Sequence, residues 1–298
     1  MTKPLSSLRR RLDRLVHFDD LSFVKSGIRV SSEDILSQLE SKGGTELYLN
    51  RYPESYIKNA LEEEGILEKI RSLNLGSLIF KMNTSDPFHQ QLYIYFNQEC
   101  PSNLIAQIIL SEGMFKPNQS FVKSVEMERL DMLIIEWLCL QNPLEKFLPE
   151  KPRLPGQDYP GLGIGRLALN LIQRVARSLK KDGVLNYPQY YHNAALYSEI
   201  FKFFNPEFHG NLFAIKKATD KIPLVEAAWI VFTGCLRDCR TKRRFRWKAE
   251  EMIAPISKKM KVYFASQEYD RIITGSAEKH SFYVDFVMWN RIKSEYLQ

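Results

Sequence analysis

The feature that most constrains the fold of this chain is an apolar run, LDMLIIEWLCL, from Leu130 to Leu140. A near-continuous apolar segment of this kind is typical of a central strand that is buried on both faces of a sheet. Glu136 is the only ionisable carboxylate between Met132 and Leu140, so a buried strand would desolvate it and raise its pKa. We therefore expect a sheet with this run at its centre and with Glu136 as the one carboxylate beyond Met132 on it.

Shorter patterned segments predict the other elements. Strands are expected over 78–82 and 92–96, which would form a hairpin, and over 104–110 and 183–187. Apolar residues at helical spacing predict helices over 53–72, divided at Gly65, over 167–179, over 193–204 and from Pro223 onward, while 281–289 fits either a strand or a helix. This order favours an α/β (α+β) fold, with a mixed, mostly antiparallel central sheet flanked by helices, over a doubly wound sheet.

Composition divides the chain into three regions. Residues 1–44 form a basic arm with leucines at helical spacing, which suits either a surface helix or a contact with nucleic acid or lipid. Residues 45–210 hold the expected sheet, and residues 211–298 are expected to be a mainly helical extension. A Pro-rich connection, Asn142–Pro160, follows the apolar run and excludes both a long helix and a central strand there.

Charge and cysteine content narrow the class of protein. The chain has 42 Lys and Arg residues against 35 Asp and Glu residues, a formal net charge of +7. Such a balance favours polyanionic partners, such as nucleic acid, a phosphorylated cofactor or an acidic membrane surface. Four cysteines in 298 residues do not make a disulfide framework, which fits a reducing, cytoplasmic compartment. Neither a secretory signal nor a transmembrane helix is expected, because no apolar segment has the required position or length.

The stretch PGLGIGR, from Pro160 to Arg166, is the main candidate for a binding site. It lacks the GxxxxGK string of a P-loop, and it lacks the third glycine and the preceding strand of a dinucleotide-binding motif. Glycines that open a helix still leave main-chain N–H groups free to meet a pyrophosphate, which the partial positive charge of the helix N-terminus also attracts. The alternative is a close-packed turn without a ligand.

The same stretch resembles a family motif. The GNAT-type N-acyltransferase superfamily binds acyl-CoA through Q/R-x-x-G-x-G/A at the start of a helix; Gly163 and Gly165 match its two small positions, with Pro160 in place of Gln or Arg. The segment HNAALYSEIFKFF is similar to the family's second motif, a helix carrying A-x-x-L-Y, and Tyr197 matches its end. The likeness in element order covers residues 47–204, although the family's strand leads almost directly into the glycine loop.

The resemblance implies a GNAT-like fold and an acyl-CoA-dependent N-acyltransferase that transfers an acetyl group to an amine. Acetyl-CoA or another acyl-CoA would be the substrate. Its binding residues would be Gly161, Leu162, Gly163, Ile164, Gly165, Arg166 and, from the second motif, Asn193. Tyr197 would be the general acid that protonates the departing thiolate, with a core tyrosine as the alternative interpretation.

Two further residues are candidates for catalysis. Glu136 would be the general base that takes a proton from the amine; alternatively it faces solvent or pairs with an arginine. His192 lies at a strand-to-helix junction near the same site, where a histidine is otherwise a partner of the helix end. Cys235 and Cys239 would share a helical face, but no His or further Cys lies nearby to complete a metal site.

The segment RDCRTKRRFRWK, from Arg237 to Lys248, supports a different function. Lys or Arg occupies most of its positions, and Phe245 and Trp247 are interleaved with them. Phosphate contacts together with base stacking use this composition, so the chain would be a nucleic-acid-binding or interaction protein on a catalytically inactive scaffold. A solvated helix face with two anchoring aromatic residues is the alternative, and so is contact with the phosphate-bearing end of CoA.

Overall fold

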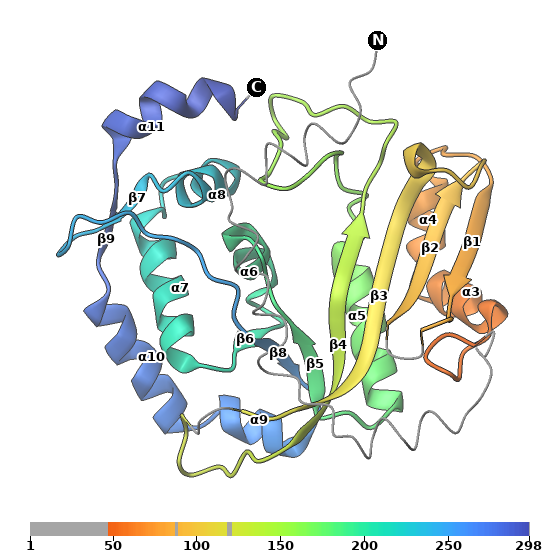
Figure 1. Cartoon of the computed structure of the whole chain (residues 1–298), viewed down its shortest axis with the longest axis horizontal. Coiled ribbons are helices and arrows are strands. Elements are labelled where there is room, and N and C mark those ends of the chain that lie inside the picture. The colour runs from red at the N-terminus through yellow and green to blue at the C-terminus, as the bar shows by residue number, and fades with distance from the viewer. Residues whose placement is uncertain (1–46, 87–88, 118–120, 298) are drawn as a thin grey trace.

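A computed structural model describes residues 47–86, 89–117 and 121–297 (Figure 1). Its main feature is a seven-stranded sheet in the order β1-β2-β3-β4-β5-β8-β6. The strands are β1 (Leu78–Asn83), β2 (Gln90–Phe96), β3 (Leu104–Phe115), β4 (Leu130–Leu140), β5 (Gly183–Asn186), β6 (Lys202–Phe203) and β8 (Met252–Pro255). Only β4 and β5 pair in parallel among these neighbours, so the prediction of a mixed, mostly antiparallel sheet is confirmed.

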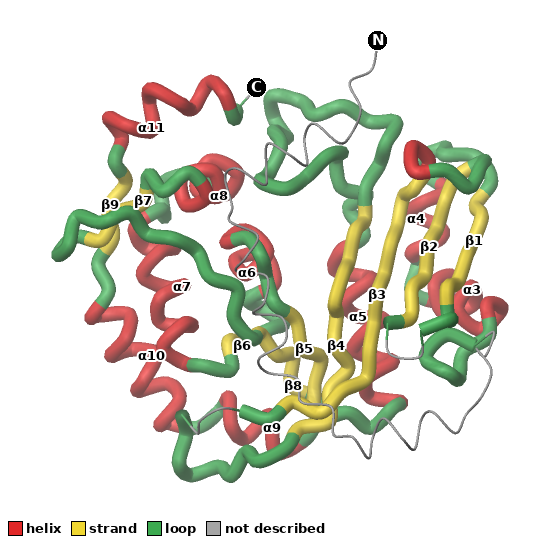
Figure 2. The backbone as a smooth tube through the Cα atoms, in the orientation of Figure 1, coloured by secondary structure: helices red, strands yellow, loops and turns green. Residues whose placement is uncertain are grey.

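Helices cover both faces of this sheet, as Figure 2 shows. They are α3 (Glu54–Glu63), α4 (Ile66–Arg71), α5 (Gly165–Ser178), α6 (Tyr191–Tyr197), α7 (Pro206–Ala218), α8 (Leu224–Phe232), α9 (Lys258–Phe264), α10 (Gln267–Lys279) and α11 (Phe286–Ile292). Single 3-10 turns lie at Pro101–Asn103 and Lys293–Glu295. Gly65, with φ of 75°, separates α3 from α4, which confirms the predicted division of that helical segment.

Two hydrophobic cores lie on opposite faces of the sheet. Apolar residues of α3, α4 and α5 pack on one face, against alternate side chains of β2, β3 and β4 that include Leu133 and Ile135. The intervening residues of β4, Met132 and Ile134, face the other core, which contains apolar residues of α9 and α10. The strand period of two thus distributes one apolar run between two cores.

The β4 strand has the predicted bounds, but only its first half is buried on both faces. Along its length β4 pairs with β3, whereas β5 meets it only at Met132–Ile135. From Glu136 onward the residues of β4 are exposed or half-buried. The expectation of a fully buried strand is therefore wrong for this half, because β5 ends at Asn186 and provides no neighbour beyond it.

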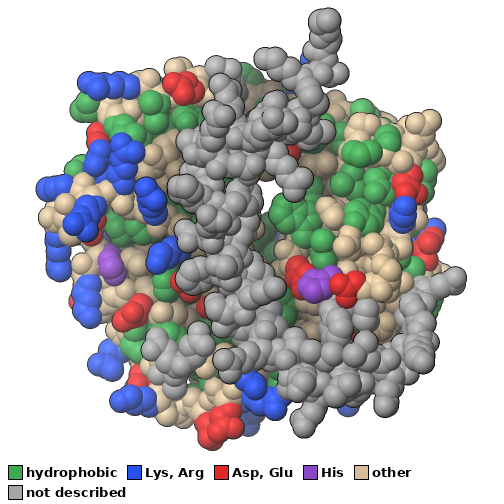
Figure 3. Space-filling view, viewed as in Figure 1, with side chains coloured by type: hydrophobic (Ala, Val, Ile, Leu, Met, Phe, Trp, Pro, Cys, Tyr) green, Lys and Arg blue, Asp and Glu red, His purple; other side chains and the backbone are tan. Residues whose placement is uncertain are grey.

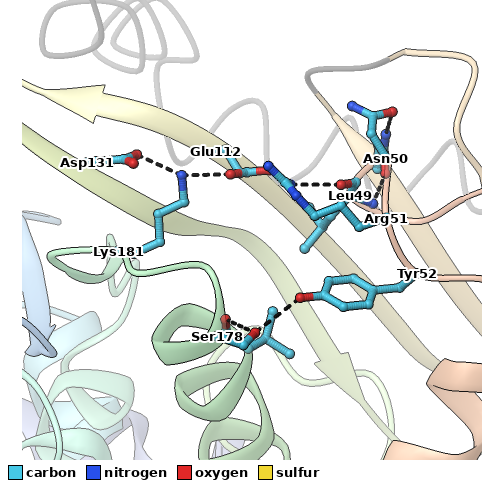
Figure 4. A network of polar contacts seen from close by, with 10 residues as sticks. Leu49, Asn50, Arg51, Tyr52, Glu112, Asp131, Ser178 and Lys181 are labelled. Carbon is cyan, nitrogen blue, oxygen red and sulfur yellow. Dashed lines mark hydrogen bonds and ion pairs between the residues drawn. The ribbon is translucent and has the colours of Figure 1, made fainter.

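A buried cation holds the first half together, at what we call the closed end of β4 (Figure 4). Lys181 Nζ lies 2.6 Å from Glu112 Oε2 and 2.8 Å from Asp131 Oδ1, and the Lys181 side chain is only 7% exposed. Arg51 also pairs with Glu112. These contacts join β3, β4 and the residues that lead into β5. We call residues 136–140 of β4 the open end.

Several expected helices are replaced by strands in the second half of the chain. The helix expected over 193–204 ends at Tyr197, and Lys202–Phe203 forms the edge strand β6, because Asn205 caps a new helix there. The region expected to be mainly helical also contains β8, which lies inside the central sheet between β5 and β6. The segment 281–289 is both strand and helix: β9 (Phe282–Val284) pairs with β7 (Leu236–Asp238), and then α11 begins.

Two expectations concern other parts of the chain. The predicted N-terminal helices lie outside the described residues. Within the described residues, no helix combines the length and apolar character that a membrane span requires.

Candidate functional site

The candidate site lies where β4 and β5 separate. The last paired residues are Ile135 on β4 and Asn186 on β5. Beyond this point β4 continues beside β3 alone, while the chain after β5 turns away into α6. Figure 3 shows the molecule hollowed between α6 and the open end of β4. The open end therefore presents one edge without a strand partner among the described residues.

Glu136 stands at a bulge at the start of this open end. Leu110 of β3 pairs with Ile135, and the adjacent Ile109 pairs with Trp137, so Glu136 is an extra residue with no cross-strand partner. A bulge of this kind re-aims a side chain and increases the local twist of the strand. It places the carboxylate of Glu136 beside the point where the two strands diverge.

The contacts of Glu136 differ from those expected. Ser111 Oγ donates a hydrogen bond to Glu136 Oε1 at 2.6 Å, and His89 Nε2 lies 3.5 Å from the same oxygen. The Glu136 side chain is 27% exposed, so the expected full burial is wrong. The sequence did not single out Ser111 or His89, because each lies in an ordinary strand or loop context and only the sheet brings them to Glu136.

The glycine loop follows β4 in space although a long connection separates them in sequence. Gln141 forms a bridge with Gly161, and the Asn142 N–H donates to the Pro160 carbonyl at 2.7 Å. The Pro-rich connection thus leaves and returns at neighbouring points, so that the loop begins where β4 ends. Trp229 Nε1 anchors this connection by donating to the Arg153 carbonyl at 2.7 Å.

Alternate residues hold the glycine loop in place. Leu162 and Ile164 are 3% and 1% exposed and belong to the core beside α5, whereas Gly161 and Gly163 are exposed. Gly163 has φ of 71°, and a Cβ at this position would meet nothing within 4 Å. The loop therefore presents bare main chain to solvent while its apolar side chains fix it to the sheet.

The N-terminus of α5 lies directly at the end of the glycine loop. Its N-cap residue, Ile164, makes no side-chain cap hydrogen bond, and its first turn carries no acidic residue. The first N–H groups of this helix therefore keep their partial positive charge without a described side-chain partner. Arg166 extends into solvent, where it pairs with Glu199; both side chains are more than 70% exposed.

Tyr197 joins α6 to this loop. Its hydroxyl oxygen lies 3.8 Å from the position that a Cβ on Gly165 would occupy. Burial raises the pKa of Tyr197 above its ordinary value of 10.0, so the phenol keeps its proton at neutral pH. The structure thus brings together the glycine loop and Tyr197, as the sequence motifs indicate.

His192 and Asn193 lie in the first turn of α6. His192 is 4% exposed, its ring stacks on Tyr190 at a centroid distance of 5.5 Å, and its Nδ1 has no hydrogen-bond partner among the described residues. Burial lowers its pKa to about 4, so His192 is neutral at pH 7. Asn193 is half-buried and donates its N–H to the Tyr190 carbonyl at 3.1 Å.

The basic segment Arg237–Lys248 is not the helix that was expected. Its first residues belong to β7, and the rest is irregular. Trp247 packs against Tyr191 and Phe203 and donates to the Pro188 carbonyl at 2.9 Å, while Phe245 packs against Phe282. The aromatic side chains therefore point into the protein, and the charged side chains at 242–244, 246 and 248 are exposed.

The cysteines also differ from expectation in their surroundings. Cys235 is buried before β7 and Cys239 follows β7, so the two do not share a helical face. Among the described residues, no group of His, Cys, Asp and Glu side chains has an arrangement that could hold a metal ion.

No protein-family model matches the chain, and no curated protein matches it. The geometry of the site is therefore the basis for its function.

Proposed function

We propose that this chain is an acyl-CoA-dependent N-acyltransferase, or a divergent relative, whose substrate lies in the gap between β4 and β5. The observation that carries the proposal is the separation of these parallel strands directly beside the glycine loop and the N-terminus of α5. In the GNAT-type superfamily, a splayed strand pair in this place seats the pantetheine arm of CoA. The connection Asn142–Pro160 interrupts the family pattern in sequence, but its two ends meet, so the glycine loop begins beside the end of β4, which supports the proposal.

Main-chain groups of the glycine loop and of β4 are suited to the pyrophosphate and the pantetheine arm of CoA, respectively. The exposed backbone of Gly161 and Gly163, with the first N–H groups of α5, is suited to the pyrophosphate. The free edge of β4 carries N–H and C=O groups that β5 does not pair, and an extended chain with amide groups pairs with such an edge as an added strand. Pantetheine is such a chain. Arg166 is available to the phosphates only if it leaves Glu199.

The catalytic roles follow from position and protonation. Glu136, at the bulge, would accept a proton from the amine. Tyr197, which keeps its proton, would donate to the departing thiolate. His192 and Asn193 lie in the first turn of α6. The neutral ring of His192 stacks on Tyr190 and supports the first turn of this helix.

The acceptor would approach from the face of the sheet opposite to α5. At the open end this face carries apolar and aromatic side chains that belong to neither core: Ile79, Tyr93, Tyr95, Ile109 and Trp137. Trp137 is 46% exposed, and Tyr93 stacks on Tyr95 at 6.0 Å. Side chains of this type bind the apolar part of a ligand, which suggests an amine with a hydrocarbon or aromatic portion.

Thermal unfolding with acetyl-CoA tests the cofactor site. Ligand at about 100 times its Kd stabilises a protein by about 2.7 kcal/mol, so the Tm of the wild type should rise by several degrees. Gly163→Asp should abolish this rise, because its carboxylate repels the pyrophosphate and its side chain covers the main chain. No rise with acetyl-CoA or with longer acyl-CoAs would contradict the proposal.

Gly65→Asp is the matched control. Gly65 has a φ of 75°, and a Cβ there would meet nothing within 4 Å, so the substitution imposes the same backbone strain as Gly163→Asp. It lies between α3 and α4, away from the glycine loop. An equal loss of the acetyl-CoA effect in both variants would attribute the loss to strain instead of to the site.

A second candidate function is binding of a polyanion such as nucleic acid through Arg237–Lys248. The exposed cationic side chains at 242–244, 246 and 248 favour it, whereas the inward-facing Phe245 and Trp247 are not available for base stacking. We therefore expect contacts with phosphate alone, which weaken steeply as salt rises. Oligonucleotide binding by the wild type and by a variant with Arg243→Ala and Arg244→Ala tests this. Absent or salt-insensitive binding would exclude it.

A further inference from the structure

The side chain of His89 lies between two carboxylates at the edge of the candidate site. Its Nδ1 is 3.0 Å from Asp86 Oδ2, and its Nε2 is 3.5 Å from Glu136 Oε1. His89 immediately precedes β2, so the cluster combines a loop, the bulge of β4 and Ser111 of β3. The Asp86 contact holds the ring with Nε2 directed at Glu136.

Glu136 and His89 differ in their access to solvent. The Glu136 side chain is 27% exposed and is fixed by the Ser111 hydroxyl, whereas the His89 side chain is 55% exposed. A base that takes a proton beside a bound substrate must lose that proton before the next turnover. His89 is an imidazole in contact with this base, and its side chain is the more exposed of the two to bulk water.

We propose that His89 relays to solvent the proton that Glu136 removes from the acceptor amine, with Asp86 orienting the ring. This inference rests on the proposed acyltransferase function and adds a residue to it. His89 acts through Glu136 and does not contact the reacting atoms, so it is a positioning residue and not a catalytic one. The Asp86 carboxylate orients the ring through Nδ1 in the same way that a carboxylate orients histidine in a catalytic triad.

The proton balance of the reaction is complete with these groups. The ammonium of the acceptor loses one proton to the Glu136 carboxylate, and the proton passes to His89 Nε2 and then to water. The lone pair of the neutral amine forms the C–N bond at the thioester carbonyl, and the C–S bond breaks. Tyr197 gives its proton to the departing thiolate, and the second proton, which leaves nitrogen as the amide forms, replaces the one that Tyr197 has lost. One proton is released for each amide made.

Steady-state kinetics with acetyl-CoA and n-butylamine test the relay, with release of CoA followed by a thiol reagent. His89→Gln should lower kcat by an order of magnitude, below the loss of about 10²-fold to 10⁴-fold expected when a general base itself is removed. The KM for acetyl-CoA should not change, because the ring lies on the acceptor side. Added imidazole should restore much of the rate, and Asp86→Asn should lower kcat by a smaller factor.

His280→Gln is the control, since His280 is a half-buried histidine at the end of α10 that stacks on Phe282 and lies far along the chain from this cluster. It should leave kcat and KM unchanged, and both variants should melt within a few degrees of the wild type. An active wild type with an equally active His89→Gln variant would overturn the relay and leave the proposed function standing. A wild type that acetyl-CoA stabilises but that transfers nothing to n-butylamine would overturn the relay. A wild type that acetyl-CoA does not stabilise would overturn the proposed function itself.

Discussion

The closed end and the open end of β4 belong to one strand with one kind of composition, yet they have opposite surroundings. At the closed end, β3 and β5 flank the strand, and residues 132–135 are buried. At the open end, β3 is the only described strand neighbour, and Glu136 and Trp137 are exposed. Trp137 at the open end therefore lies at a surface, whereas the apolar residues of the closed end are buried in the two cores.

The polar groups at the two ends differ in the same way. Lys181 Nζ lies 2.6 Å from Glu112 and 2.8 Å from Asp131, and its side chain is almost fully buried. Glu136 is held by Ser111 at 2.6 Å but retains access to solvent and to His89. A satisfied, enclosed ion pair fixes structure, while a restrained and partly exposed carboxylate is still able to exchange a proton. Stability and chemistry are thus assigned to different ends of one strand.

The largest effect that we expect is from Lys181→Met at the closed end. Removal of the cation leaves Asp131 without the Lys181 ammonium and leaves Glu112 with Arg51 alone, and loss of one partner from a buried pair costs about 3–5 kcal/mol. The partial exposure of Asp131 favours the lower part of this range. Urea unfolding measures the change. Lys58→Met, which removes an exposed pair with Glu54 on α3, is the control and should change stability by less than about 0.5 kcal/mol.

An equal effect of the two lysine substitutions would show that the closed end is not more tightly held than the surface. Acetyl-CoA should still stabilise Lys181→Met, since the glycine loop lies at the opposite end of β4. Loss of the stabilisation by acetyl-CoA in Lys181→Met would show that the two ends of β4 are not independent, and it would contradict the comparison.

An intermediate effect is expected from glycine-to-alanine changes at the two ends. A Cβ at Gly183, where β5 begins, would lie 2.8 Å from Ile253 Cγ2 and 2.9 Å from the Ala254 carbonyl. Crowding of this kind in a packed core costs about 1–3 kcal/mol. A Cβ at Gly161 would meet only the Leu140 carbonyl at 3.7 Å, so Gly161→Ala should lie within about 0.5 kcal/mol of the wild type. Paired melting curves measure both, and a larger loss at Gly161 would contradict the comparison.

The smallest expected effect is a loss of folding stability at acidic pH. Burial raises the pKa of Glu112, but hydrogen bonds from Lys181 and Arg51 outweigh it and hold the pKa below its ordinary value of 4.5. The folded state therefore binds this proton less readily than the unfolded state. The resulting stability is present above pH 4.5 and is lost as pH falls through the lower folded pKa. Denaturation at several pH values should give a shallower acid dependence for Lys181→Met, and an unchanged slope would contradict this origin.

Local patterns in the sequence predicted much of the fold. The apolar run gave the bounds of β4, the shorter runs located β1, β2, β3 and β5, and Gly65 divided α3 from α4. The short strands β6 and β8 were missed because two and four residues are too few to establish a period. The basic segment was expected to be helical. In the structure, Phe245 and Trp247 point inward while the charged residues next to them are exposed, and the many charges made this alternation hard to recognise in the sequence.

The candidate site was predictable only in part. The glycines and Tyr197 were found because each lies in a motif whose spacing is local, and the fold then brings the Tyr197 hydroxyl to the start of α5. Glu136 was found as the one carboxylate between Met132 and Leu140, but its partners Ser111 and His89 were not. Ser111 and His89 are distant from Glu136 in sequence, and only the pairing of strands in the sheet brings them together.

The sequence by itself determined most of the longer strands and helices, and it determined that a glycine loop precedes α5, because periodicity and backbone freedom are local properties. Only the tertiary structure decided that β5 ends halfway along β4, that Glu136 bulges there, and that Asn142–Pro160 returns the chain to the end of β4. The physical reason is that burial and pairing depend on which neighbour a residue receives. An apolar run has the same pattern whether the next strand covers all of it or only half.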